Sequence, residues 1–146
     1  MKIEIQIDDT VEETVVKIMA NRYSDEIEHI KNRLLEPHHH KLSAFREDGV
    51  ELLDYDEVVR IYSEDKKILL DTMNATYTTR LKLYELEERL GDLQFIAISR
   101  SEIINLNYVK RLDLSFTGTI AVEFKNGATS YVARRHLKNF KKALGL

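Results

Sequence analysis

The sequence predicts an α+β fold in which short strands and hairpins outnumber helices. Short runs rich in Val, Ile, Leu, Tyr and Thr recur along most of the chain, and dipeptides typical of tight turns separate several of them. Three other stretches repeat apolar residues every three or four positions, which is the period of an amphipathic helix. These observations favour a small globular protein of one domain plus a short additional unit.

The chain begins with a predicted β-β-α unit over residues 1–37. Residues 2–8 alternate between apolar and polar side chains, which is typical of a half-buried strand. The alternation places three isoleucines on one face: Ile3, Ile5 and Ile7. Residues 14–20 predict a second strand after a short polar turn.

The third element of this unit is a helix over residues 25–36. Ser24 offers an N-cap, and Pro37 ends the helical pattern. A unit of this size is too small to bury an adequate core. We therefore expect residues 1–37 to dimerise or to dock a partner.

A larger domain is predicted over residues 40–146. Residues 81–91 and 135–144 have helical periodicity. Strands are expected at residues 41–46, 50–53, 58–62, 68–72, 76–79, 95–98, 112–116, 119–124 and 128–132.

Turns and loops punctuate these strands. Asp48-Gly49 and Asn126-Gly127 are hairpin-type pairs, and the second is typical of a type I′ turn. Thr117-Gly118 predicts a further turn. Residues 63–67 and 99–101 are predicted loops.

Charge is distributed unevenly along the chain. Residues 1–92 carry 13 basic and 22 acidic side chains, whereas residues 93–146 carry 9 basic and 3 acidic ones. The overall net charge of −3 therefore combines a front part of −9 with a back part of +6. Such asymmetry points to a polyanionic partner.

Several function classes are excluded by composition and missing motifs. The absence of cysteine removes disulfides, cysteine nucleophiles and Cys-type zinc or iron–sulfur sites. No nucleophile elbow, phosphate-binding loop, dinucleotide fingerprint or metalloprotease motif occurs, so we expect no enzyme, no cofactor and no small-molecule substrate. Neither a signal peptide nor an apolar run of about 20 residues is present, which favours a cytoplasmic protein.

The run His38-His39-His40 is a compositional oddity. Histidine-rich tracts can bind metal, but neighbouring residues on an extended backbone point to opposite sides. Only His38 and His40 could share a side, and no nearby Asp or Glu spacing completes a ligand set. We interpret the run as a solvated linker and expect no metal site.

Basic residues are the stronger indication of function. Several of them lie in or beside predicted loops, close to Ser, Asn and Tyr residues that suit phosphate and base-edge contacts. They are Lys66, Lys67, Arg100, Arg134, Arg135, Lys138, Lys141 and Lys142. On charge alone the partner is either nucleic acid or the acidic surface of another protein.

Four segments in order resemble the LytTR family of DNA-binding domains. The stretch FIAISRSEIIN at residues 95–105 is similar to the family signature. Three flanking segments agree with it: DYDEVVRIYSEDKK at 54–67, LYELEERL at 83–90 and NGATSYVARR at 126–135. The resemblance covers about residues 40–144.

The resemblance implies short, mostly antiparallel strands with a helix at their edge. It also implies sequence-specific binding to duplex DNA, usually by two protomers on direct repeats, through loops that enter successive major grooves. Three positions would then read bases: Lys67 (with Lys66 as the neighbouring choice), Arg100 and Arg135. Contacts to the DNA backbone would come from Lys66, Ser99, Ser101, Tyr131, Arg134 and Lys138, whereas Asn105 would hold the local protein backbone.

The front part is too short for the phospho-acceptor receiver that many LytTR proteins carry. About 40 residues precede the resemblance, and a receiver needs more than a hundred. The chain is similar to compact LytTR regulators without a receiver, which are often paired with a small membrane protein that restrains them. A homodimer and such an inhibitor are therefore expected partners, and the alternative function is a protein-interaction module.

Overall fold

The computed structural model describes residues 1–35, 41–91 and 94–146 of the chain. The chain forms two compact units, Met1–His39 and His40–Leu146. The predicted helix stop at Pro37 and the histidine run at 38–40 lie outside the described residues.

The first unit contains one helix, α1 (Asp25–Leu35), as the sequence predicts. Its start is defined by Ser24, whose hydroxyl oxygen accepts a hydrogen bond from the backbone N–H of Ile27 at 3.4 Å. Acidic side chains in the first turn stabilise the helix, because they lie near the positive end of its dipole. None of the helix residues is fully buried.

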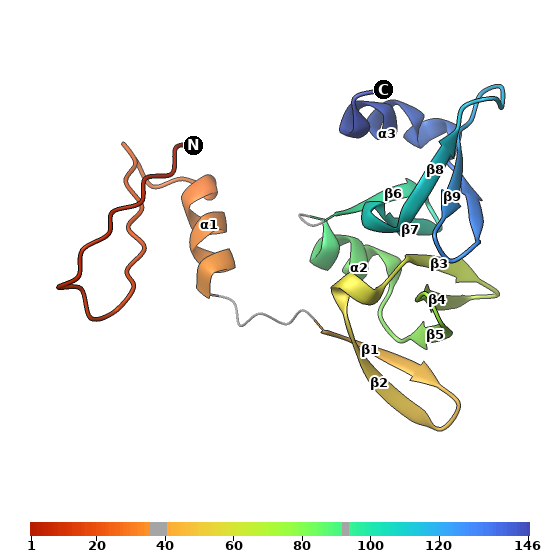
Figure 1. Ribbon diagram of the computed structural model, residues 1–146, viewed down its shortest axis with the longest axis horizontal. Helices are drawn as coiled ribbons and strands as arrows, with labels where there is room; N and C mark the ends of the chain where they lie inside the picture. The colour runs from red at the N-terminus through yellow and green to blue at the C-terminus, as the bar shows by residue number, and fades with distance from the viewer. Residues whose placement is uncertain (36–40, 92–93) are drawn as a thin grey trace. The chain divides into compact units, whose positions relative to one another are not determined.

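The two strands predicted before this helix are wrong. Residues 1–24 contain no strand, and the chain there follows an open, extended path (Figure 1). The side chains of Ile3, Ile5 and Ile7 are 78%, 82% and 89% exposed. An isolated two-stranded ribbon is marginally stable in water, so apolar alternation alone does not produce a sheet without a further layer or strand to cover it.

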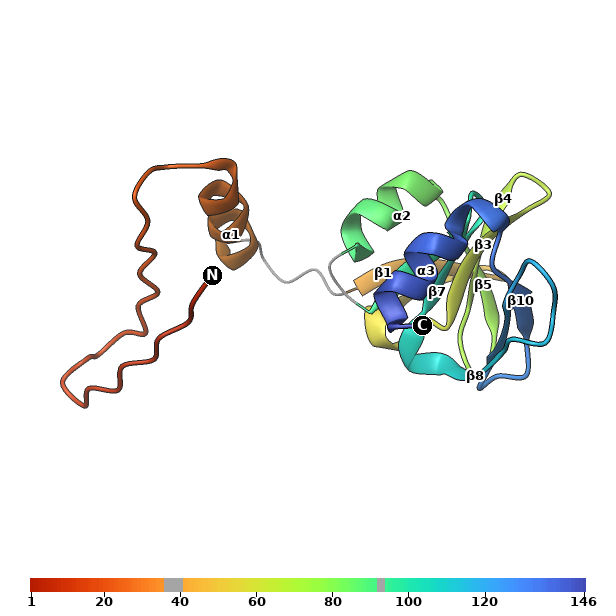
Figure 2. The ribbon, with the colours of Figure 1, turned by 90° about the horizontal axis from the view of Figure 1, so that it is seen from above.

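The second unit is built around two antiparallel sheets. The larger sheet has seven strands in the order β2-β1-β5-β4-β3-β7-β6, and the smaller has three in the order β10-β9-β8. Every strand pairing in both sheets is antiparallel. Together with the helices, these strands give the predicted α+β class, with mostly antiparallel strands (Figures 1 and 2).

In chain order the elements are β1 (Lys41–Arg46), β2 (Gly49–Asp54), the 3-10 turn η1 (Tyr55–Glu57), β3 (Arg60–Glu64), β4 (Lys67–Asp71), β5 (Thr76–Thr79), α2 (Leu83–Leu90), β6 (Phe95–Ser99), β7 (Glu102–Asn105), η2 (Leu106–Tyr108), β8 (Val109–Asp113), β9 (Ala121–Phe124), β10 (Thr129–Tyr131), η3 (Arg134–His136) and α3 (Leu137–Leu144).

The predicted loop at 63–67 is in fact a tight hairpin turn. Glu64 pairs with Lys67, which leaves only Asp65 and Lys66 between β3 and β4. Both turn residues have positive φ, 51° and 64°. A two-residue turn with this backbone matches the twist of the flanking strands, and Asp is one of the residues that tolerate it.

Two predicted turns differ in detail from the structure. The β1–β2 turn consists of Glu47 and Asp48, so the predicted pair Asp48-Gly49 is displaced by one residue. The β9–β10 connection is a three-residue loop that ends in Gly127 (φ 91°). Because Asn126 has no positive φ, the turn is not type I′; a glycine in the left-handed region closes the hairpin instead. The turn at Thr117-Gly118 is present.

Strand β7 is missing from the sequence prediction, and β8 begins three residues earlier than predicted. Ile103 and Ile104 are both buried, but in different clusters on opposite faces of the sheet. A strand that is buried on both faces does not alternate in polarity, so its periodicity gives no signal.

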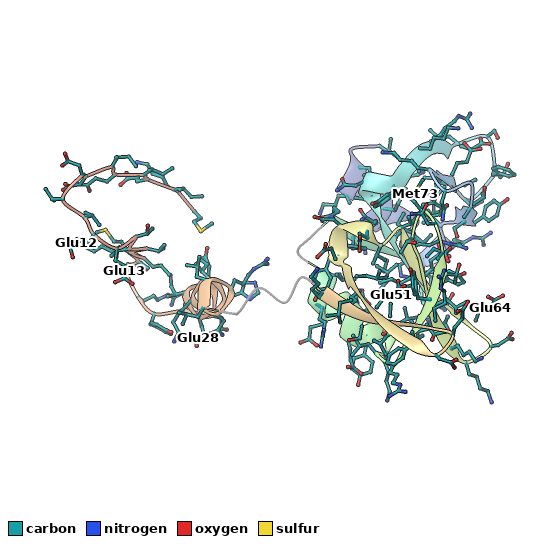
Figure 3. The ribbon with its side chains drawn as sticks, turned by 60° about the horizontal axis from the view of Figure 1, so that its bottom comes forward. Glu12, Glu13, Glu28, Glu51, Glu64 and Met73 are labelled. Atoms are coloured by element: carbon teal, nitrogen blue, oxygen red, sulfur yellow. The ribbon has the colours of Figure 1, made fainter. Side chains whose placement is uncertain are left out.

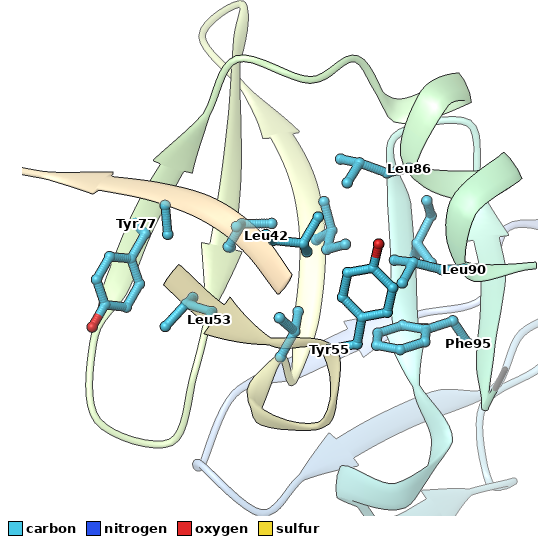
Figure 4. Close-up of a cluster of buried hydrophobic side chains, with 12 residues drawn as sticks. Leu42, Leu53, Tyr55, Tyr77, Leu86, Leu90 and Phe95 are labelled. Atoms are coloured by element: carbon cyan, nitrogen blue, oxygen red, sulfur yellow. The ribbon is translucent and has the colours of Figure 1, made fainter. Parts of the chain in front are cut away.

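Two hydrophobic clusters hold the second unit together. One cluster packs Leu86 and Leu90 of α2 against one face of the large sheet, together with Tyr55 and Phe95 (Figure 4). The other cluster packs the opposite face of β6 and β7, with Val59 just before β3, against the small sheet and against Phe140 of α3. Around β6 and β7 the fold therefore has three layers, and these layers fix the ends of both strands.

Candidate nucleic-acid interface

The turn between β6 and β7 carries Arg100 at its tip. A bulge between Ala97 and Ser99 disturbs the register, so that Ser99 pairs with Glu102 and only Arg100 and Ser101 lie between the strands. The hydroxyl oxygen of Ser99 accepts a hydrogen bond from the backbone N–H of Ser101 at 3.1 Å and lies 3.2 Å from the Ser101 hydroxyl. The two serines therefore shape the turn, while the Arg100 side chain is exposed.

The β3–β4 hairpin lies directly beside this turn. The backbone N–H of Ser63 donates a hydrogen bond to the carbonyl oxygen of Ser101 at 2.9 Å. Lys66 occupies the hairpin turn, and Lys67 begins β4 opposite Glu64. Two of the three loops predicted to read DNA are thus joined by a backbone hydrogen bond.

The third predicted loop approaches from the other side of β6. The backbone N–H of Ala133 donates to the carbonyl oxygen of Ile98 at 2.8 Å. Arg134 and Arg135 follow immediately in η3, which continues into α3. The β6–β7 turn is therefore bordered by the β3–β4 hairpin on one side and by the start of η3 on the other.

Tyr131 and Arg134 border a different neighbour, the β8–β9 connection. The Tyr131 ring is half exposed and meets the ring of Phe116 edge to face, with 5.7 Å between the ring centroids. An Nη atom of Arg134 lies 3.9 Å from where a β-carbon on Gly118 would stand. Phe116 was not singled out from the sequence, and its place beside Gly118 in a turn was its only signal.

The predicted DNA-contacting cations are exposed and unpaired. Across residues 1–35, 41–91 and 94–146, none of them has a salt bridge or a side-chain hydrogen bond. In contrast, Lys41 pairs with Asp54 at 2.9 Å and Arg111 pairs with Glu123 at 3.2 Å. The unpaired set consists of Lys66, Lys67, Arg100, Arg134, Arg135 and Lys138.

A sequence profile described as the LytTr DNA-binding domain matches residues 48–145. The chain belongs to the LytTR family. The matched segment contains all nine residues predicted to contact DNA. LytTR is a family of DNA-binding domains, so the chain is a DNA-binding protein of the transcription-regulator class.

Relatives and a solved structure agree with this assignment. Proteins of Staphylococcus aureus strains NCTC 8325 and bovine RF122, both described as uncharacterized HTH-type transcriptional regulators, are each 29% identical over 147 residues. The alignments cover 100% of this chain and 99% of each relative. The LytTr DNA-binding domain of a Bacillus cereus protein, which carries the description of a methyl-accepting/DNA response regulator, superposes with a TM-score of 0.70 at 26% identity. That match covers 73% of this chain and 98% of the other.

A partly buried ion cluster links the two sheets of this LytTR domain. The Arg60 guanidinium donates to Asp71 at 2.8 Å and to the Ser130 hydroxyl oxygen at 2.9 Å, and it approaches Glu102 at 3.5 Å. The Ser130 hydroxyl lies 2.6 and 2.8 Å from the two carboxylate oxygens of Glu102. The Arg60 guanidinium also lies 4.2 Å above the ring of Tyr62. The cluster joins β3, β4, β7 and β10, and hence both sheets.

Burial raises the pKa of Glu102 above the ordinary value of 4.5, although the hydrogen bond from Ser130 and the charge of Arg60 lower it in part. Glu102 directly follows the Arg100–Ser101 turn, so the cluster anchors one end of that turn. The only indication of this cluster in the sequence is a single arginine, Arg60, among the apolar residues around β3.

Asn105 holds the backbone, as predicted. It is fully buried, and its side chain donates to the carbonyl oxygen of Val58 at 2.9 Å and accepts from the backbone N–H of Asn107 at 2.9 Å. The bond to Val58 ties the end of β7 to the segment just before β3, and the bond from Asn107 caps the 3-10 turn η2.

The described residues offer no metal centre and no membrane span. No group of three or more His, Asp or Glu side chains suited to a metal ion occurs among them, and His38–His40 lie outside them. No helix in the described part of the chain is both long and apolar enough to cross a bilayer.

Proposed function

We propose that this LytTR domain recognises specific duplex DNA sequences by placing its three basic loops in successive major grooves. The observation that carries the proposal is the pair of backbone hydrogen bonds, Ser63 to Ser101 and Ala133 to Ile98, that sets the three loops side by side. The cations on these loops have no protein partner among the described residues. Unpaired cations on adjacent loops suit phosphates and base edges.

The residue types suggest which side chains read bases and which contact phosphates. Arg100 and Arg135 can each donate two parallel hydrogen bonds to guanine O6 and N7, which discriminates against a wrong base by about 1–3 kcal/mol. Lys67 is a point charge and positions more than it specifies. Contacts to phosphate would come from Lys66, Ser99, Ser101, Tyr131, Arg134 and Lys138.

A helix-turn-helix does not fit the described fold. That motif needs two helices joined by a short turn, with the second helix in the major groove. In the described part of the chain, strands separate α1 from α2 and α2 from α3. Base reading through loops is therefore the mode that this fold supports best.

Two further partners belong to the proposal. Two protomers would bind direct repeats, and a small membrane protein would restrain the regulator. A footprint of two equally oriented half-sites would support the first. Co-purification of such a protein from detergent extracts with the full chain, but not with a chain carrying a disrupted N-terminal segment, would support the second.

The experiment that tests DNA recognition is a salt titration on paired probes. Binding to a promoter fragment and to the same bases in scrambled order is measured at increasing salt concentration. Contacts to about five or six phosphates predict a log–log slope near −5, with tighter binding to the promoter at every salt concentration. Equal affinity for both probes would instead favour the alternative, a basic face that docks an acidic protein.

A further inference from the structure

The extended N-terminal segment exposes both apolar side chains and unpaired backbone groups. Ile3, Ile5 and Ile7 are each more than three-quarters exposed, and no backbone–backbone hydrogen bond of residues 2–7 occurs within the described chain. Figure 3 shows the N-terminal segment as an open trace that bends near Glu12 and Glu13, with its side chains drawn as sticks. A row of free N–H and C=O groups beside an apolar stripe is a template for another strand.

The sequence of this segment is self-complementary when it is paired antiparallel about Ile5. In that register Ile3 faces Ile7 of a second copy, and Ile5 faces Ile5. On the other face Lys2 is opposite Asp8, and Glu4 is opposite Gln6. Opposite charges directly across a strand pair stabilise it, and like charges destabilise it.

Other registers lose this complementarity. A shift of two residues in one direction sets Glu4 opposite Glu4, and a shift in the other direction sets Glu4 opposite Asp8. A shift of one residue sets isoleucines opposite polar side chains. A parallel pair in register sets Lys2 on Lys2 and Asp8 on Asp8. Among these arrangements, only the antiparallel register about Ile5 pairs all three isoleucines and opposes no like charges.

We propose that residues 2–8 form an antiparallel strand pair with residues 2–8 of a second copy of this chain, with Ile5 opposite Ile5. The pair is isologous, since each contact from one copy is repeated by the other. The Lys2–Glu4 salt bridge of the single chain, at 2.9 Å, is highly exposed and easily exchanged for Lys2–Asp8 across the pair. The pairing concerns the N-terminal segments alone, sets no orientation for the second unit, and does not depend on how the loops read DNA.

Cysteine cross-linking tests the register, because the natural chain has no cysteine. In the proposed pair, the two residues at position 5 have β-carbons about 4.5–5.5 Å apart, and a shift of roughly 1 Å between the strands brings them to disulfide distance. The two residues at position 3 are offset by four residues along the paired strands, which puts them about 14 Å apart. Full-length Ile5→Cys treated with copper phenanthroline should give a covalent dimer, and Ile3→Cys should not, whereas the double variant Ile3→Cys/Ile7→Cys should.

Each result bears directly on the proposal. Equal cross-linking of Ile3→Cys and Ile5→Cys would overturn the register, and no cross-linking of Ile5→Cys would overturn the pairing. Retention of the chain on phosphatidylglycerol vesicles, with a monomer in solution, would show that a lipid surface covers the isoleucines and would also overturn it.

A charge exchange provides a second, independent test. Lys2→Asp puts like charges opposite each other twice in the dimer and should raise its dissociation constant in sedimentation equilibrium about tenfold. Adding Asp8→Lys restores opposite charges and should recover most of the affinity. Lys17→Asp, a matched change outside residues 2–8, should have little effect. Equal weakening by Lys2→Asp and Lys17→Asp, or no recovery in the exchanged chain, would contradict the proposed pairing.

Discussion

The carbonyl oxygen of Ser101 accepts a hydrogen bond from the backbone N–H of Ser63 at 2.9 Å. This bond joins the turn that carries Arg100 to the hairpin that carries Lys66 and Lys67. Because it involves backbone atoms only, it survives most side-chain substitutions in either loop. A side chain can therefore be removed from one loop without displacing the other, which allows the roles of the loops to be tested separately.

Arg100→Ala should weaken binding to the preferred DNA site by about 1–3 kcal/mol and relax discrimination at one base position. The reason is the loss of a bidentate donor from the tip of the β6–β7 turn. Equilibrium binding to a panel of single-base variants measures the effect. Arg111→Ala is the matched control, because Arg111 is already paired with Glu123, and it should leave the base preference unchanged.

Lys138→Ala should weaken binding to all DNA sequences alike. Lys138 lies exposed on α3 without a salt bridge among the described residues, and a lost phosphate contact reduces the magnitude of the log–log salt slope by about one unit. Titrations at four or more salt concentrations measure the slope. Lys41→Ala, which removes a lysine paired with Asp54, should keep the wild-type slope. A change in base preference in Lys138→Ala would contradict the assigned role.

Ser130→Ala should destabilise the second unit by about 1–3 kcal/mol at neutral pH, because both Arg60 and Glu102 lose a hydrogen-bond partner. The Ser130 bond lowers the pKa of Glu102, so its removal should raise that pKa further above 4.5. A carboxyl group with a raised pKa favours folding below its ordinary pKa and loses that contribution as the pH rises. The difference in stability between variant and wild type should therefore shrink as the pH falls through the raised pKa of Glu102, which lies above 4.5, and should stay constant at lower pH. Urea unfolding at several pH values measures it, and a difference independent of pH would contradict this assignment.

Gly127→Ala should cost about 1–2 kcal/mol of stability. Gly127 has a φ of 91°, in a region that residues with a β-carbon avoid, although no heavy atom stands within 4 Å of the new carbon. Gly49→Ala is the control, since Gly49 has no positive φ and its nearest neighbour would be 3.9 Å away. Thermal unfolding compares the two. Equal losses would show that backbone strain is not the cause.

Local pattern predicted the second unit well. The short strand predicted at 76–79 and the periodic helices at 81–91 and 135–144 appear in the structure close to their predicted bounds. Residues 102–105 were missed because Ile103 and Ile104 are buried on opposite faces, which removes the alternation that marks a strand. The five-residue loop at 63–67 became a two-residue turn because Asp65 and Lys66 adopt positive φ, which charge and polarity do not reveal.

At the N-terminal end of the chain, the local pattern predicted strands that the structure does not contain. Residues 2–8 have a clear strand pattern, yet no strand forms there in the single chain. Periodicity predicts which face a segment would bury but not what would cover it. Prediction of the candidate interface met the same limit, because strands that are distant in sequence assemble it. Arg100 and Arg135 could be proposed from their motifs. The ion cluster of Arg60, Asp71, Glu102 and Ser130, in contrast, required two strand pairings and the packing of the small sheet on the large one, which no local pattern encodes.

The central claim is that the loops of this LytTR domain read DNA sequence. Selection of bound duplexes from a randomised library, carried out in parallel with the wild type and Arg100→Ala, tests it most directly. The wild type should enrich a defined motif, and Arg100→Ala should enrich the same motif with the preference lost at one position. An identical motif from both proteins, or no motif from the wild type, would contradict it.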